Sequence, residues 1–286
     1  MLYLALATIF VTVNSLILKW GEMRGQNRVI IMAVNYGLGA FICGIIWVVS
    51  GSSGPEMFTV GLGILTGVLY AGVLWFLMGS LLEAGLALAQ IAIRLSIVIP
   101  ILISIVWFGE RPSLPQAVGI SVAVGAFALL AVAGMRDPES VVRGSRFGAR
   151  ALFYMAGVFV FQGGVGVSQK LFDVFGVPEE RWCFLFCLFS SGTVLALVRL
   201  AWVPCRPRRM DCVRGVLFGF SNIGMSWSIL CALSQVPASV AFPMMGIGVI
   251  IATVPAGMLF WSEFPGYSGY LALFASVFAI FLLAGF

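Results

Sequence analysis

Long apolar runs alternate with short polar or glycine- and proline-rich breaks along almost the whole chain. Crossing a bilayer takes about 20 apolar residues in a helix, and the runs between the breaks have that length. The stretches polar enough to lie in water, at about 19 to 28, 134 to 150, 170 to 181 and 204 to 214, leave no room for an extramembrane domain. The pattern predicts ten transmembrane helices at about 2 to 19, 29 to 49, 57 to 80, 86 to 108, 115 to 134, 150 to 170, 182 to 203, 213 to 233, 238 to 261 and 267 to 285.

Composition supports an all-α membrane protein. The residues are 61% hydrophobic and 9% charged, whereas ordinary soluble domains carry roughly 25% charge. The net charge of +5 is read as a topology signal and not as a nucleic-acid footprint. Histidine is absent and the six cysteines form no CxxC pair, so no metal, cofactor or catalytic group is expected. The apolar N-terminus is expected to be retained as the first span.

The second half of the sequence resembles the first. At a spacing of 152 (215 minus 63), Gly63, Gly67 and Trp75 match Gly215, Gly219 and Trp227, and neighbouring spacings match further positions. Five spans is an odd number, so a second copy enters the membrane in the opposite sense. Inverted repeats of this kind are typical of secondary transporters with a substrate site between the copies. The predicted domains are a first repeat at 1–134, a polar linker at 135–149 and a second repeat at 150–286.

One stretch resembles a known family. Arg94-Leu95-Ser96-Ile97-Val98-Ile99-Pro100, followed by Phe108-Gly109-Glu110-Arg111-Pro112-Ser113 and by Gln116, Gly119 and Gly125, is similar to the span 4 and span 5 signature of the EamA-like branch of the drug/metabolite transporter superfamily. The resemblance implies two five-helix units around a central cavity, and it implies no particular substrate. The second copy keeps Glu263 and Pro265 but lacks the following glutamine.

The candidate site centres on Arg94, which the segmentation places near the middle of the fourth span. A midspan arginine is costly in lipid and marks function by default, although it could instead tie the span to backbone carbonyls. Gln90 lies one turn earlier on the same face. Interhelical hydrogen bonding and core packing are the alternative roles for the remaining polar and aromatic candidates. These candidates for substrate binding are Asn14, Tyr36, Tyr70, Trp75, Gln162, Asn222 and Trp227.

Prolines interrupt two predicted spans at Pro100, Pro243 and Pro255. Each removes a backbone hydrogen bond, so these positions are predicted hinges, with a passive bend as the alternative. Glu110 and Glu263 precede helices that begin near a proline, and we expect them to stabilise the N-terminal dipoles of those helices.

The embedded charges favour an anionic, zwitterionic or neutral metabolite over an organic cation. Arg94 is the one predicted midspan charge, and Lys19 and Lys170 stand at matching span ends. A coupling proton or ion is left open. The bias of basic residues places the termini outside, whereas the family resemblance favours termini inside. Twelve basic residues fall on one predicted side (Lys19, Arg24, Arg28, Arg136, Arg143, Arg146, Arg150, Arg199, Arg206, Arg208, Arg209 and Arg214), against Arg111, Lys170 and Arg181 on the other.

The sequence therefore predicts a secondary transporter that moves a small metabolite by alternating access. The alternative is a flippase or exporter of lipid-linked or amphipathic compounds. An intramembrane enzyme is disfavoured because it would need clustered Asp, His or Cys, and saturable counterflow would exclude a channel. The expected partners are a small-molecule substrate and the lipid bilayer, with no nucleic acid, in a monomer or homodimer. A prokaryotic inner membrane is expected from the excess of arginine over lysine and the short loops.

Overall fold

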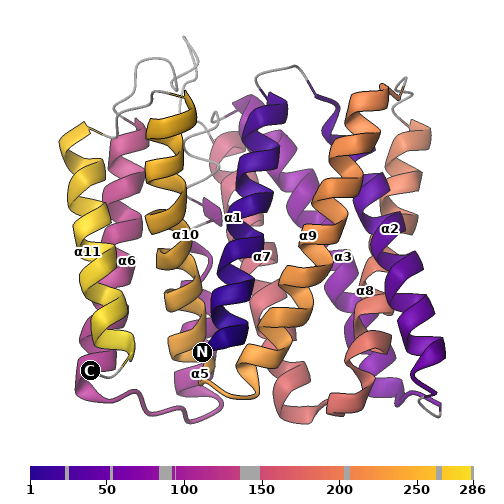
Figure 1. Ribbon diagram of the computed structural model, residues 1–286, viewed down its shortest axis with the longest axis horizontal. Coiled ribbons are helices and arrows are strands. Elements are labelled where there is room, and N and C mark those ends of the chain that lie inside the picture. Colours follow the sequence, from indigo (N-terminus) through magenta and orange to yellow (C-terminus); the bar gives the residue numbers. More distant parts are fainter. Residues whose placement is uncertain are drawn as a thin grey trace. The chain divides into compact units, whose positions relative to one another are not determined.

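The computed structural model describes residues 1–22, 26–51, 54–83, 92–93, 95–135, 149–202, 207–261 and 266–284. Over these ranges the regular elements are all helical (Figure 1). They are α1 (Leu2–Glu22), α2 (Arg28–Val49), α3 (Met57–Glu83), α5 (Val98–Val106), α6 (Leu114–Met135), α7 (Ala149–Phe175), the 3-10 turn η1 (Pro178–Glu180), α8 (Arg181–Trp202), α9 (Arg209–Leu233), α10 (Ala238–Trp261) and α11 (Gly266–Ala284).

The predicted apolar segments coincide with helices to within a few residues, apart from the segment at 86 to 108. Much of that segment lies outside the described residues, and its described part contains α5. Within the described residues, seven helices are long and apolar enough to cross a membrane, and the apolar stretches Leu114–Ala126 and Leu273–Leu283 are shorter. The chain is thus an α-helical membrane protein with several apolar helices, and the full number of ten crossings stays a prediction.

Local signals in the sequence explain where several helices begin and end. The side chain of Asn27 accepts hydrogen bonds from the backbone N–H groups of Val29 and Ile30 at the start of α2, which is the usual role of asparagine at this position. Gly51 follows the end of α2 with φ of +66°, a conformation that glycine adopts without a steric penalty. At the start of α6, Gln116 accepts from the N–H of Ser113 at 2.9 Å, which forms half of a capping box.

Two predicted aqueous stretches are shorter than expected. The stretch at 170 to 181 was predicted to lie in water, but α7 continues to Phe175 and Glu180 is buried. The stretch at 204 to 214 was predicted likewise, but α9 begins at Arg209 and buries both Asp211 and Arg214. Hydropathy counts a charged residue as solvated even when neighbouring parts of the protein cover it, and the position of both stretches relative to the membrane stays a prediction.

The contacts divide the chain into two compact units that do not follow the sequence halves. The first unit contains residues Met1–Ala71 and Ser168–Gln235, and the second contains Gly72–Val167 and Val236–Phe286. Each unit therefore combines helices from the first half with helices from the second. The predicted division into repeats at 1–134 and 150–286 concerns the order of the sequence and stays a prediction.

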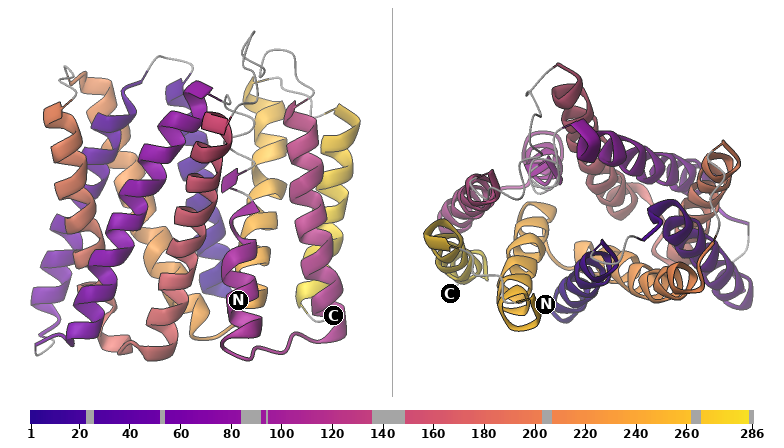
Figure 2. Two further views of the ribbon diagram at one scale, coloured as in Figure 1. Left: turned by 180° about the vertical axis from the view of Figure 1, so that it is seen from behind. Right: turned by 90° about the horizontal axis from the view of Figure 1, so that it is seen from above.

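In the first unit, α2 packs along α8 and α9, and α1 packs along α9 (Figures 1 and 2). The helices α2 and α8 run antiparallel, because Gly39 lies against the ring of Phe189 while Gly192 lies against the ring of Tyr36. Around this pair the buried core is rich in phenylalanine and leucine. Its largest fully buried members are Phe184, Phe189, Leu185 and Leu188.

Paired glycines bring backbones of the first unit close together. A Cβ placed on Gly63 of α3 would stand 2.8 Å from the carbonyl oxygen of Phe184 on α8. A Cβ placed on Gly215 of α9 would stand 3.0 Å from the carbonyl oxygen of Ile31 on α2. One turn further, Gly67 meets α8 and Gly219 meets α2 in the same manner. Small residues permit this close approach, which drives helix association where lipid provides no hydrophobic force.

In the second unit, α6 and α11 lie side by side, and α10 packs against α5, α6 and α11 (Figure 2). Gly119 near the start of α6 meets Ala279 and Leu283 near the end of α11, so these two helices are antiparallel. The part of α3 from Gly72 onward packs against α7, where Gly72 accommodates the ring of Phe161.

Candidate functional site

Buried amides form the centre of the candidate site in the first unit. Asn222, near the middle of α9, donates from Nδ2 to Oδ1 of Asn35 on α2 at 3.2 Å. The two residues are 3% and 0% exposed. The net contribution of such a hydrogen bond is about 1 kcal/mol, but a buried amide that loses its partner costs about 1–3 kcal/mol. The pair therefore fixes the register between α2 and α9, and it places amide groups inside an apolar helix bundle.

Asn14 on α1 adds an unsatisfied acceptor to this polar region. Its side chain is 7% exposed, and its Oδ1 is buried without a hydrogen-bond partner among the described residues. The other polar residues of α1, Thr8, Thr12 and Ser15, donate to carbonyl oxygens one turn earlier in their own helix. Among these four residues, Asn14 is thus the one with a buried acceptor left for another partner.

The register of α1 against α9 places Asn14 relative to the amide pair. Ser221 donates to the carbonyl oxygen of Phe10 at 2.9 Å, and the guanidinium of Arg214 lies 6.0 Å from the ring centre of Trp20. The two helices are therefore antiparallel, and Asn14 falls between these two levels. Phe10 lies beside Ser221 and Asn222 of α9, and Asn14 lies one turn of α1 away from Phe10.

Aromatic side chains pack against one another on the helices of the first unit. Tyr36 and Tyr70 meet edge to face with their ring centres 6.5 Å apart. Trp227 lies 5.5 Å from the ring of Tyr3 and stacks on Trp182 at 6.1 Å. The predicted candidates Asn14, Tyr36, Tyr70, Asn222 and Trp227 all belong to the first unit.

Two further predicted candidates belong to the second unit. Trp75 belongs to the second unit, where it is 47% exposed and lies 5.9 Å from the ring of Tyr154. Gln162 is half-buried on α7 in the same unit. Gln90 and Arg94 lie outside the described residues, so their roles stay predictions.

The predicted hinges occupy different positions in their helices. Pro100 lies in the first turn of α5, directly after a turn at Ser96 and Ile97, where a missing backbone N–H is tolerated. It packs against Gly166 of α7. Pro243 and Pro255 lie inside α10. Hinge motion at these prolines stays a prediction.

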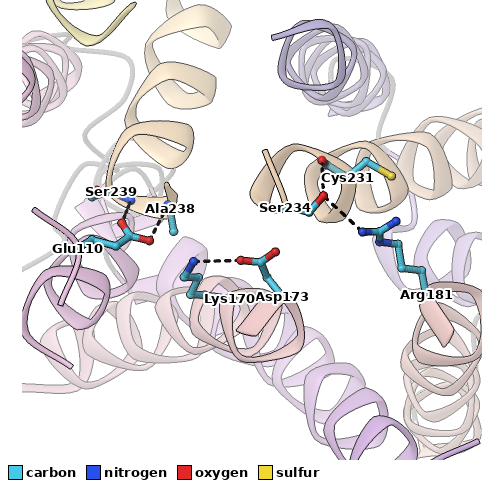
Figure 3. Close-up of polar contacts among 8 residues, drawn as sticks. All are labelled: Glu110, Lys170, Asp173, Arg181, Cys231, Ser234, Ala238 and Ser239. Carbon is cyan, nitrogen blue, oxygen red and sulfur yellow. Dashed lines mark hydrogen bonds and ion pairs between the residues drawn. The ribbon is translucent and has the colours of Figure 1, made fainter. Parts of the chain in front are cut away.

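Glu110 stabilises a different helix from the predicted one. It was expected to interact with the N-terminus of the helix that follows it, which is α6. Instead, its two carboxylate oxygens accept from the backbone N–H groups of Ala238 and Ser239, at 3.0 and 2.8 Å, at the start of α10 (Figure 3). The partner is 128 residues away in sequence. Glu263 lies outside the described residues.

Buried and half-buried charged groups lie near helix ends of the first unit. Lys170 and Asp173 form an ion pair at 3.0 Å with side chains 10% and 12% exposed, and Arg181 donates to Ser234 at 3.3 Å (Figure 3). Since Asp173 accompanies Lys170, this span end carries less net positive charge than the sequence prediction assumed.

Sequence reasoning missed Asn35, Tyr3 and Trp182. The available signal for Asn35 was a single amide inside the apolar run at 28–49, seven residues after Arg28. A polar residue at such a position is expected to find a partner on another helix. The two aromatic residues carried no signal beyond their positions near span ends.

Comparisons with known proteins support the fold and do not identify a family. No protein-family model matches the sequence, and no curated protein matches it. A solved structure described only as "Crystal structure of protein" is similar in fold, with a TM-score of 0.77 over 98% of this chain and 94% of that chain. The two sequences are 14% identical. The similarity establishes a shared fold and nothing about the substrate.

Proposed function

We propose that the chain is a secondary transporter of the EamA-like drug/metabolite type, built from two inverted five-helix repeats. In this proposal it is not an enzyme. It moves a small anionic, zwitterionic or neutral metabolite across a prokaryotic inner membrane by alternating access.

The observation that carries the proposal is a set of exchanged contacts. Gly63 corresponds to Gly215, and Ile31 to Phe184, at spacings of 152 and 153 (215 minus 63, 184 minus 31). The contact of Gly63 with Phe184 is therefore equivalent to the contact of Gly215 with Ile31. Reciprocal contacts of this kind arise when two copies of one unit pack around a two-fold axis.

The same exchange recurs elsewhere in the chain. Gly72 lies against Phe161, and the equivalent Gly224 lies against Phe10. The corresponding helices α2 and α8 are antiparallel neighbours, which is the arrangement expected when one repeat is inverted with respect to the other. Inverted repeats support transport because each repeat supplies half of a site that opens to alternate sides.

The buried amides provide chemistry for such a site. The Asn35–Asn222 pair and Asn14 lie within helices long enough to cross a membrane. Polar groups in that environment either bind one another or bind a substrate. Amides donate and accept hydrogen bonds without a charge, which suits a neutral or zwitterionic metabolite and gives no counterion for an organic cation.

A thermal-shift screen tests this function. The purified protein is heated with pools of anions, zwitterions, neutral sugars and cations, beside Arg94→Ala and Asn14→Leu. A ligand at 100 times its Kd stabilises the folded protein by about 2.7 kcal/mol. We expect a pool of anions, zwitterions or sugars to stabilise the wild type and to act more weakly on both variants.

The active compounds are then tested for counterflow in proteoliposomes, which is expected to saturate. Stabilisation by cations or amphipathic compounds alone, equal in the variants, would instead support a drug or lipid exporter. Flux that rises linearly with concentration would contradict a carrier of either kind.

A further inference from the structure

We propose that Asp211 and Arg214 form a binding site for a ligand that carries both a primary ammonium and an anionic carboxylate or phosphate. This site lies at the start of α9, apart from the buried amides. It does not depend on the proposed transport function.

The two side chains form an incomplete ion pair. Nη1 of Arg214 lies 3.5 Å from Oδ1 of Asp211, and the side chains are 4% and 2% exposed. Oδ2 of Asp211 and Nε of Arg214 are buried and have no hydrogen-bond partner among the residues that the structure describes. Removing such atoms from water without a partner is strongly unfavourable.

A second buried pair on α7 shows what a satisfied arrangement looks like. Lys170 and Asp173 have the same spacing in sequence, but they approach to 3.0 Å, and within the described part of the chain neither has a buried unsatisfied atom. The unsatisfied atoms therefore distinguish the Asp211 and Arg214 pair from this second pair.

The surroundings complement the charges of both side chains. Asp211 lies in the first turn of α9, where the helix dipole favours a carboxylate. The guanidinium of Arg214 lies over the ring of Trp20 at 6.0 Å. A guanidinium that interacts with an aromatic ring can still use the N–H donors in its own plane for hydrogen bonds. The free Nε–H is one of these in-plane donors.

The free atoms define what a ligand must offer. Oδ2 of Asp211 requires a hydrogen-bond donor, and Nε–H of Arg214 requires an acceptor. An anion alone would leave the carboxylate unsatisfied and would be repelled by it, and a cation alone would leave the guanidinium unsatisfied. A ligand with an ammonium and an anionic oxygen satisfies both.

The turn that precedes the site is exposed. Arg208, Arg209 and Met210, in the turn above Asp211, are exposed. The packing of Ile31 on Gly215 also brings the start of α2, with Arg28, to the level of this turn. Basic residues at this end attract the anionic group of an approaching ligand.

Two sources could supply this chemistry, a free amino acid or the headgroup of phosphatidylethanolamine. The test measures thermal unfolding of the detergent-purified protein with glycine, and separately with propionate and ethylamine, which carry one charge each. A parallel arm uses phosphatidylcholine nanodiscs with or without phosphatidylethanolamine, because the choline headgroup has no N–H donor.

The variants are Asp211→Asn and Arg214→Lys, which retains the charge but lacks the planar fork. Asp173→Asn is the matched control. We expect glycine, phosphatidylethanolamine or both to stabilise the wild type and Asp173→Asn, with the single-charge compounds inactive. Affinity is expected to fall about tenfold or more in the other two variants, since each loses one charge-assisted contact.

A response to glycine alone assigns the site to a free solute, and a response to phosphatidylethanolamine alone assigns it to lipid. The proposal is wrong if neither stabilises the wild type, in which case water satisfies the two atoms. It is also wrong if propionate or ethylamine acts as strongly as glycine, or if Asp211→Asn and Arg214→Lys respond like the wild type. If neither variant folds, the wild type decides, through the comparison of glycine with propionate and ethylamine and of nanodiscs with and without phosphatidylethanolamine. Because these measurements involve no transport, their failure leaves the proposed function untouched.

Discussion

Replacing Gly67 by alanine is expected to lower the free energy of unfolding by about 3 kcal/mol, the upper end of the usual range for overpacking. The added methyl group would overlap the side-chain oxygen of Ser191 and the carbonyl oxygen of Leu188 on α8. Backbone atoms cannot rotate away, so α3 and α8 must separate. The measurement is thermal unfolding of the purified protein in detergent.

Gly61 provides the matched control for this substitution. It lies on the same helix, and a Cβ there meets nothing within 4 Å. Gly61→Ala is expected to leave stability unchanged or raise it by about 0.5–1 kcal/mol, because alanine favours the helix. Equal melting temperatures for the two variants would show that the close contact between α3 and α8 does not exist.

Replacing Glu110 by alanine is expected to destabilise the protein by about 2–4 kcal/mol, because two charge-assisted hydrogen bonds disappear together. The backbone N–H groups of Ala238 and Ser239 are in the first turn of α10 and have no partner within that helix. Glu110→Gln keeps an acceptor oxygen and is expected to have a smaller effect.

The control for this prediction is Glu179→Ala, since Glu179 is an exposed glutamate in η1. It is expected to unfold at the wild-type temperature. If Glu110→Ala also does so, the carboxylate does not hold the start of α10.

The sequence predicted the helices well because long apolar runs leave few alternatives in a membrane. The start of α2 at Arg28 and the end of α10 at Trp261 lie within a residue of the predicted limits. Hydropathy did not reveal buried charge. The run of arginines before Gly215 indicated a loop, yet α9 begins at Arg209 and includes Asp211 and Arg214, whose guanidinium lies over the ring of Trp20 on α1.

The candidate site was less predictable because its partners are distant in sequence. The amide of Asn222 was identified from its place in an apolar span, but its partner Asn35 is 187 residues away. Glu110 was correctly expected to stabilise a helix N-terminus, and the wrong helix was chosen since the only helix visible nearby in the sequence was α6. Local patterns identify a group that needs a partner, and the packing of helices decides which partner it receives.

The repeated glycines connect the sequence to the proposed function. Gly63 and Gly215 were matched by spacing alone. In the structure Gly63 of α3 meets a backbone carbonyl of α8, and Gly215 of α9 meets a backbone carbonyl of α2. This reciprocity is the reason for proposing inverted repeats and, with them, transport by alternating access. The most direct test is the side of the membrane that equivalent loops face.

The measurement is labelling of single cysteines with a membrane-impermeant maleimide, in a background from which the six native cysteines have been removed. Gly54→Cys and Arg208→Cys report on equivalent loops before α3 and α9, and both positions are exposed. The account predicts that intact cells label Gly54→Cys while inside-out vesicles label Arg208→Cys, with the arginine-rich loop in the cytoplasm. If intact cells label Arg208→Cys and inside-out vesicles label Gly54→Cys, only the predicted orientation is wrong. Labelling of both positions from the same side would contradict the inverted repeats.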